Sequence, residues 1–247
     1  MGKKYKHPPI IEAVCEFRFE PGSPWDQVFY GLVYEKIRDS GFHKRQPIKE
    51  VDFGVRQLAN GIEQELKTID QIRFLREDEK AFIQVGPDKL SVHHLKPYPS
   101  WPEFQPLVLK GFDAYLEAVK PKGIQRIGLR YINRIEIPGT KVKAEDYFEF
   151  YPFVGKQLPQ EFGPFIVGIE VPYEGDRDIL RIMLTSIRST TPNIACVVLD
   201  LDYFLNKPES VLLTNVSNWI NIAHDHHVEE VFEACIRDPL RKIFGEE

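Results

Sequence analysis

Alternation of apolar and polar residues with a period of two recurs along most of this chain, and it limits the possible folds more than any other feature. In the first alternating segment the apolar residues occupy every second position, at Ile11, Ala13, Cys15, Phe17 and Phe19. Successive side chains of a β-strand point to opposite faces of a sheet, so this segment predicts a half-buried strand.

Alternating segments continue further along the chain. From about 48 to 95 turn residues separate them, and they predict a meander of three or four antiparallel strands, within 48–56, 62–69, 71–77, 80–86 and 89–95. Beyond Gly123 the same pattern predicts a long strand and then three more, at 124–137, 164–173, 178–188 and 194–203. The chain thus has enough strands for one large antiparallel sheet.

Four segments of the chain are predicted to be helical. A first stripe runs through Phe29, Leu32, Val33 and Ile37, and Gly41 ends that helix. A second helix begins near Ser100 and carries apolar residues at helical spacing as far as Val119. Two helical segments close the chain at about 208–236 and 238–244, whereas 143–159 is irregular and only weakly helical.

These elements predict an α+β protein with a large antiparallel sheet and helices packed on one of its faces. Each half of the chain reads strand, helix, several strands, helix, which indicates a duplicated β-α-β-β-β-α unit. We therefore expect a single globular domain over 1–247, with pseudo-repeats at about 8–120 and 121–247 that share one continuous sheet.

Composition and charge argue against several classes of function. The chain is 43% hydrophobic and has a net charge of −5, with acidic and basic residues mixed along its length. Such a chain can bury a core, but its bulk charge provides no basic field for nucleic acid or anionic lipid. Since no run of about 18 apolar residues is present, we expect no membrane segment.

The cysteines and the first residues bear on localisation. Cys15, Cys196 and Cys235 lie far apart among apolar residues, without the spacing of a disulfide framework or a metal site. Buried, reduced thiols fit a reducing compartment. Charged residues from Glu12 onward interrupt the segment that a signal peptide would need to keep apolar. We expect a soluble, cytoplasmic protein.

A row of arginines is the most distinctive candidate site. Arg126, Arg130 and Arg134 share one face of the predicted strand 124–137, with Gly128 and Ile132 between them. Guanidinium groups suit phosphate or carboxylate, and Gly128 would let a ligand approach the backbone, so the row predicts an anion site. The alternative is structural: if the opening strands of the two halves pair, Glu12 and Glu16 neutralise the row.

A second candidate is a metal site on the C-terminal helix. His224 and His227 lie three residues apart and would share a helical face. Asp200 and Asp202 share one face of the strand 194–203 and could supply oxygen ligands. No known metalloenzyme spacing is matched, and a solvated histidine cluster is the structural alternative.

Aromatic residues concentrate in the irregular segment. Tyr147, Phe150 and Tyr151 are candidates for contact with a partner, while packing under a sheet edge is the structural alternative. Sequence motifs for nucleophilic catalysis and for phosphate-binding glycine loops are missing from the chain. We therefore lean against an enzyme and expect no cofactor.

Three segments together resemble a sporadically distributed prokaryotic protein family of about this length. They are Pro8-Pro9-Ile10-Ile11-Glu12-Ala13-Val14, the strand from Arg126 to Ile135, and the helix from Trp219 through His224 to Phe232. The family has no assigned activity or catalytic residues, so the resemblance implies a single unit and, by its sporadic distribution, a link to mobile or defence-related loci.

Two hypotheses follow. The first is a non-enzymatic binding or adaptor protein that engages a protein partner, a second copy of itself, or a small anionic or nucleotide ligand. The second is a metal-dependent hydrolase or nuclease-like enzyme built from Asp200, Asp202, His224 and His227.

Overall fold

A computed structural model describes residues 4–22, 25–58, 61–161 and 163–245, with side chains left out of the description at 51–67. It contains a nine-stranded antiparallel sheet and the helices of an α+β fold, which confirms the predicted fold class. The strand order is β2-β3-β4-β5-β1-β6-β9-β8-β7. None of the helices in the described ranges is long and apolar enough to cross a lipid bilayer.

Most strands agree closely with the alternating segments, but β2 begins at Phe42, six residues before the predicted segment 48–56. Their bounds are β1 Ile10–Phe19, β2 Phe42–Leu58, β3 Gly61–Arg76, β4 Ala81–Gly86, β5 Lys89–Leu95, β6 Ile124–Pro138, β7 Ile166–Tyr173, β8 Asp178–Ile187 and β9 Ile194–Leu205. The predicted segments 62–69 and 71–77 form one strand, β3, so the meander has four strands. The opening strands β1 and β6 are neighbours in the sheet, as the structural alternative for the arginine row requires.

The helices follow their apolar stripes in part. Leu32, predicted in the stripe of the first helix, is 46% exposed, and the C-terminal helix begins at Val216 after a 3₁₀ turn, not at about 208. Helix α1 covers Val28–Ile37 and α2 covers Trp101–Val119. The long C-terminal helix is continuous, and consists of α3 Val216–Ile222, a π-helical turn Ala223–Val228 and α4 Glu229–Cys235. Helix α5 covers Asp238–Phe244.

The chain divides into two compact units. The first unit comprises Met1–Cys15, Leu95–Tyr98 and Gln125–Glu247, and the second comprises Glu16–His94 and Pro99–Ile124. The two halves differ in content, because β6 is followed by a loop with a single short 3₁₀ turn where β1 is followed by α1. The duplication and the single domain therefore stay predictions.

In the second unit, α2 provides the core. Its buried face packs on the end of β1, where Phe112 lies 4.8 Å from Phe17 and Tyr115 stacks on Phe19 at 4.5 Å between ring centroids. Gly111 leaves room for Ile83 and Val92, because a Cβ at this position would lie 3.1 Å from the Val92 side chain. Helix α1 lies beside α2, and Lys36 pairs there with Glu117.

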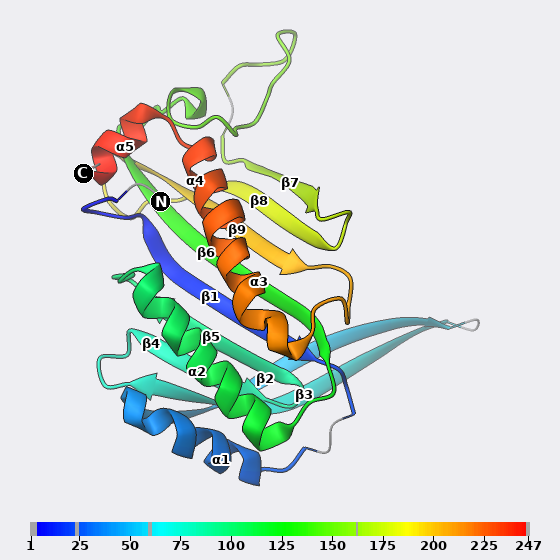
Figure 1. Cartoon of the computed structure of the whole chain (residues 1–247). Helices are drawn as coiled ribbons and strands as arrows, with labels where there is room; N and C mark the ends of the chain where they lie inside the picture. Colours follow the sequence, from blue (N-terminus) through cyan, green and yellow to red (C-terminus); the bar gives the residue numbers. More distant parts are fainter. Residues whose placement is uncertain (1–3, 23–24, 59–60, 162, 246–247) are drawn as a thin grey trace. The chain divides into compact units, whose positions relative to one another are not determined.

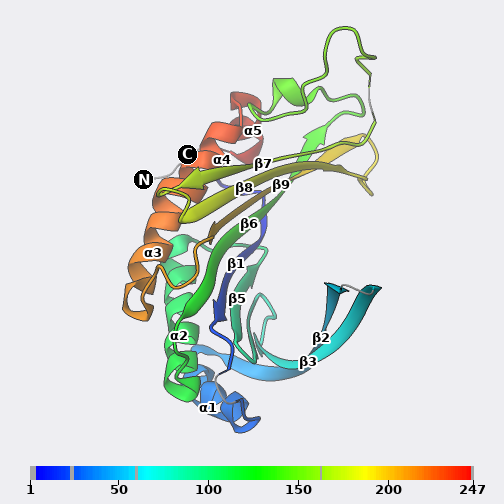
Figure 2. The ribbon, with the colours of Figure 1, turned by 90° about the vertical axis from the view of Figure 1, so that its right-hand side faces the viewer.

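In the first unit, the long C-terminal helix lies across β6 and β9 (Figures 1 and 2). Every second residue of β9 faces this helix and is buried, including Leu199, Leu201 and Tyr203. The residues between them point away from the helix. We call this opposite side of β6, β9, β8 and β7 the outer face.

Candidate functional site

The arginine row lies on the outer face, between β1 and β9. The register of β6 and β9 sets Arg130 opposite Asp202 and Ile132 opposite Asp200. Arg130 forms a two-pronged ion pair with Asp200, with Nε–Oδ1 2.8 Å and Nη2–Oδ2 2.5 Å, and Arg126 Nη2 lies 3.0 Å from Asp202 Oδ2. The row is thus compensated by carboxylates of the neighbouring strand.

The pairing extends across the outer face. Arg134 lies 3.0 Å from Glu136, and Arg181 of β8 lies 2.6 Å from Glu170 of β7. The guanidinium groups of Arg126 and Arg181 both lie over the ring of Phe204, at 4.7 and 5.4 Å from its centroid. The hydrogen bonds that Arg130 donates to Asp200 are the main reason that the pKa of Arg130 is raised.

These contacts favour the structural interpretation of the row, with Asp200 and Asp202 as partners in addition to the charge of Glu12. Glu12 acts on Arg130 through its charge and helps to raise its pKa. Glu16 contacts Arg18 at 2.8 Å and Lys89 at 3.5 Å. The largest compensation comes from Asp200 and Asp202, which the sequence suggested as metal ligands instead.

The structure does not bring the four suggested metal ligands together. Tyr203 stacks on His227 with ring centroids 4.3 Å apart, so this side of β9 faces the helix. Asp200 and Asp202 alternate with the helix-facing residues and therefore point to the outer face. The two carboxylates and the two imidazoles lie on opposite sides of the sheet and cannot bind one ion.

His224 instead lies in a different group with Asp225 and Glu229. One ligand atom from each of these residues lies within 4.8 Å of the others. His224 Nδ1 is 2.8 Å from Asp225 Oδ1, which orients the imidazole. His224 and Asp225 belong to the π-helical turn, and Glu229 begins α4. The His224 ring lies beside that of Tyr131, whose hydroxyl oxygen is 2.8 Å from that of Tyr98. Its donor set could hold a divalent cation.

The aromatic segment 147–153 mostly packs against its own unit. Tyr147, Phe150 and Tyr151 are half-buried. Phe148, the residue between them, is fully buried and bridges to Ile236, and the Tyr147 carbonyl accepts from Arg237 N–H at 2.9 Å. The exposed aromatic residue of this segment is Phe153, at 88%.

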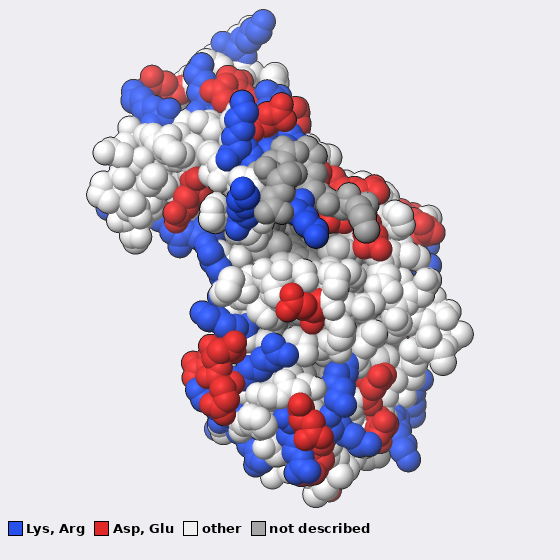
Figure 3. Space-filling model, turned by 60° about the vertical axis from the view of Figure 1, so that its left-hand side comes forward, with Lys and Arg blue, Asp and Glu red and all other residues white. Residues whose placement is uncertain are grey.

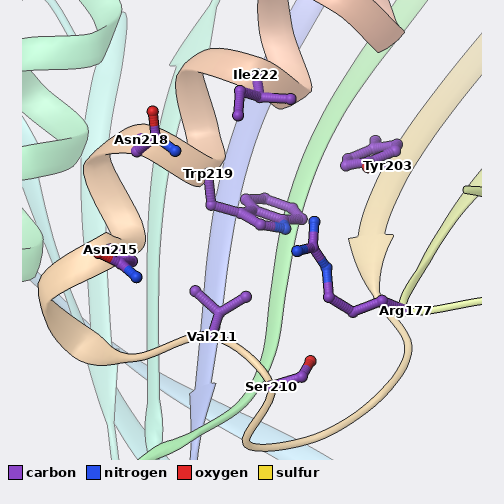
Figure 4. Close-up of a pocket in the computed structure, with 8 residues that line it drawn as sticks. All are labelled: Arg177, Tyr203, Ser210, Val211, Asn215, Asn218, Trp219 and Ile222. Atoms are coloured by element: carbon purple, nitrogen blue, oxygen red, sulfur yellow. The ribbon is translucent and has the colours of Figure 1, made fainter. Parts of the chain in front are cut away.

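A small pocket opens beside α3. It encloses about 120 Å³ and is lined by residues from the turn before β8, from β9, from the loop that follows β9 and from α3: Arg177, Tyr203, Ser210, Val211, Asn215, Asn218, Trp219 and Ile222. Figure 4 shows Trp219 reaching from the helix toward the Arg177 guanidinium. The pocket therefore combines an aromatic wall with polar groups at its rim.

A buried carboxylate holds this pocket in shape. Asp178 has no exposed surface, and its Oδ2 accepts from Tyr203 Oη at 2.9 Å and from Arg177 Nη2 at 2.5 Å, while its Oδ1 accepts from Trp219 Nε1 at 3.1 Å. A buried charge is tolerated only when it is paired and hydrogen-bonded. Sequence reasoning missed Asp178, although it falls in phase with the buried Leu180, Ile182 and Leu184.

Asp178 and its partners Arg177, Tyr203 and Trp219 form a hydrogen-bonded hub. His227 packs against this hub through Tyr203. Its side chain packs between Tyr203 and Tyr173, at 4.3 and 4.5 Å between centroids, and only 8% of the residue is exposed. Neither ring nitrogen has a hydrogen-bond partner among the described residues. Burial lowers the pKa of His227, an effect that the charges of Asp178 and Glu174 partly oppose.

Strand β7 forms one edge of the sheet, and its exposed residues are apolar. It pairs with β8 on one side and is last in the strand order on the other. Ile166 is 72% exposed and Ile169 46% exposed. The loop before β7 adds exposed Phe153 and Leu158, and β8 ends at exposed Ile187. Large exposed apolar residues therefore gather in the segment 153–187.

The charged surface has no single sign. On the face drawn in Figure 3, Lys and Arg side chains are interspersed with Asp and Glu, and uncharged surface separates the groups. The three cysteines are buried as free thiols, and burial raises the pKa of Cys235 to about 11.

Comparison with protein-family models and with curated proteins gives no match for this chain. The resemblance to a prokaryotic family therefore stays a prediction. Function must be argued from the sites themselves, because a fold of this kind carries no function by itself.

Proposed function

We propose that this protein is a non-enzymatic binding or adaptor protein that engages a protein partner along the free edge of β7. The observation that carries this proposal is an eight-residue edge strand whose exposed side chains include Ile166 and Ile169. Exposed edge strands are usually short, charged or covered, because they otherwise pair with other chains.

The physics of strand addition fits this edge. An extended segment that joins a sheet edge gains main-chain hydrogen bonds, and its alternate side chains contact apolar residues on either face. On the helix-facing side of β7 the alternating residues are Val167, Ile169 and Val171, and on the outer face Ile166 begins the strand. Phe153 and Leu158, in the loop that leads into β7, are also exposed apolar residues.

The metal-dependent hydrolase has less support. Its two carboxylates form ion pairs with Arg126 and Arg130 on the outer face, and His227 packs between two tyrosines on the other side. These four side chains therefore cannot bind a single metal ion, which the hydrolase mechanism would require.

The proposal is tested by selecting random extended peptides displayed on phage against the immobilised protein. We expect selected peptides to bind the wild type and to lose binding to Ile166→Pro, because proline removes an edge-facing N–H. The control variant is Leu212→Lys, at an exposed apolar residue outside β7. Peptides that bind wild type and Ile166→Pro equally would contradict the proposal.

The pocket at Arg177 supports a second candidate function, the binding of a small polar ligand. Hydrogen bonds to Asp178 hold three lining residues of the pocket in place, Arg177, Tyr203 and Trp219. The side-chain amides of Asn215 and Asn218, which also line it, make no hydrogen bond within the described chain. A thermal-shift panel of small carboxylates, amides and nucleotides tests it. Stabilisation should be lost in Asn218→Leu and kept in Ser217→Leu, whose position is exposed and outside the pocket. A panel in which no compound stabilises the wild type contradicts this second function.

A further inference from the structure

We infer that the protein partner of β7 is a second copy of this chain, paired antiparallel through the same strand. This inference rests on the proposed function and adds the identity of the partner. It follows from the direction of the backbone groups, the order of the side chains and the placement of charge along β7.

The backbone groups of β7 alternate between β8 and the free edge. Ser186 N–H donates to the Phe165 carbonyl at 3.0 Å, and β7 and β8 stay in register through Tyr173. The groups of every second residue from Phe165 therefore face β8. Those of Ile166, Gly168 and Glu170 face the free edge, where Pro172 offers only its carbonyl.

A twofold axis at Ile169 makes this edge complementary to itself. It sets Ile169 against Ile169, Val167 against Val171, and Ile166 against Pro172 of the second copy. The edge-facing N–H groups of Ile166, Gly168 and Glu170 then meet the carbonyls of Pro172, Glu170 and Gly168. Each donor on this edge finds an acceptor, and the missing N–H of Pro172 falls at the end of the ladder, where it interrupts no other pair.

The placement of charge also suits a symmetric pair. Symmetric dimers use the same patch on both copies, so like charges at the patch would oppose each other. Glu170 is the single charged residue of β7, and it is already paired with Arg181 of its own chain at 2.6 Å. In the proposed register it lies directly across from Gly168, which has no side chain to clash with it.

The side chains add an apolar contact on the helix-facing side. Ile169 is 46% exposed in the single chain, and the twofold axis places two such residues in contact. Val167 and Val171 flank them on both copies, which produces a short apolar ladder of β-branched residues.

Light scattering after size-exclusion chromatography, across the micromolar range, tests the inference on the full chain. We expect the wild type to dimerise with increasing concentration, and Ile169→Lys to weaken self-association roughly tenfold or more, because two lysines would meet at the axis. Ile166→Pro should weaken it through the backbone. Leu212→Lys, a lysine at another exposed apolar site, should dimerise like the wild type. Thermal unfolding of each variant shows that the monomer remains folded.

Two results overturn the inference. A wild type that stays monomeric throughout, while phage-selected peptides still bind at β7, leaves the proposed function standing and removes the second copy as its partner. A wild type that dimerises equally with Ile169→Lys and Ile166→Pro places the dimer interface elsewhere. If selected peptides also ignore Ile166→Pro, the proposed function fails as well.

Discussion

Strands β9 and β7 both pair with β8, yet they differ in which of their groups have partners within the sheet. On β9, Asp200 and Asp202 are paired with arginines, and both edges of the strand are hydrogen-bonded within the sheet. On β7, one edge has no neighbouring strand within the described residues, and the exposed side chains include Ile166 and Ile169. The charged side chains of β9 are thus paired within the sheet, whereas the backbone groups at the free edge of β7 can bind another strand.

The comparison shows that charge density is a poor guide to a binding site in this protein. Arg126 and Arg130 attract attention in the sequence, but in the sheet they face carboxylates at ion-pair distance. The arginines thereby compensate two carboxylates whose side chains are only 17% and 14% exposed. The free backbone groups and exposed isoleucines of β7, in contrast, cannot be recognised as a binding site from the sequence.

The largest effect is expected at Asp178, where the sheet interior depends on a buried charge. Asp178→Ala removes the acceptor for Tyr203 Oη and Trp219 Nε1, so two buried donors lose their partner. We expect a loss of about 3 kcal/mol in the free energy of unfolding, measured by urea denaturation.

The matched control is Glu136→Ala, which removes an exposed carboxylate from its pair with Arg134. It should cost less than about 1 kcal/mol. Equal losses for the two variants would show that Asp178 is not the hub that the structure indicates.

His227 should give an intermediate effect that depends on pH. Its pKa is lowered by burial from the ordinary value near 6.5, so the unfolded chain binds more protons once the pH falls below that value. Stability contributed by the neutral imidazole is present above about pH 6.5 and is lost as the pH falls toward the lowered folded pKa. His227→Phe should flatten this acid dependence and stabilise the protein by about 1 kcal/mol at neutral pH, because it removes two unpaired nitrogens.

Unfolding curves at several pH values, with His226→Phe as control, measure this prediction. His226 is exposed on the same π-helical turn, so its replacement shows how much of the change in acid slope comes from removing any histidine there. An unaltered acid slope in His227→Phe would mean that other groups govern acid stability.

The smallest effect is expected in the arginine row. Arg130→Ala breaks an ion pair whose arginine is 46% exposed, and should cost about 1 kcal/mol or less. We also expect phosphate and nucleotides to leave the melting temperature of wild type and variant unchanged. Stabilisation of the wild type that Arg130→Ala abolishes would restore the anion site and break the comparison between β9 and β7.

Much of the fold was predictable because alternation reports directly on which residues face a sheet. The same alternation correctly placed Arg126, Arg130 and Arg134 on one side of β6. Strand order was not predictable in the same way, since pairing of β6 with β9 joins residues about 70 positions apart, as in the contact of Arg130 with Asp200.

The hub at Asp178 was within reach of sequence reasoning. A carboxylate in phase with Leu180, Ile182 and Leu184 must lie on the buried side of its strand, and must therefore find partners. His227 is similarly in phase with buried Val216, Ile220 and Ala223 of the helix. The free edge of β7 could not be predicted, because no local pattern states which strand lies last in a sheet.

Amide hydrogen exchange along β7, measured at a protein concentration where Ile169→Lys is monomeric, tests the free edge most directly. In that variant we expect fast exchange at Ile166, Gly168 and Glu170, and slow exchange at Val167 and Val171, whose amides face β8. In concentrated wild type the three edge-facing amides should become protected as the second copy pairs with them. Strong protection of these amides already in the monomer would show that the edge is not free, and would contradict the account.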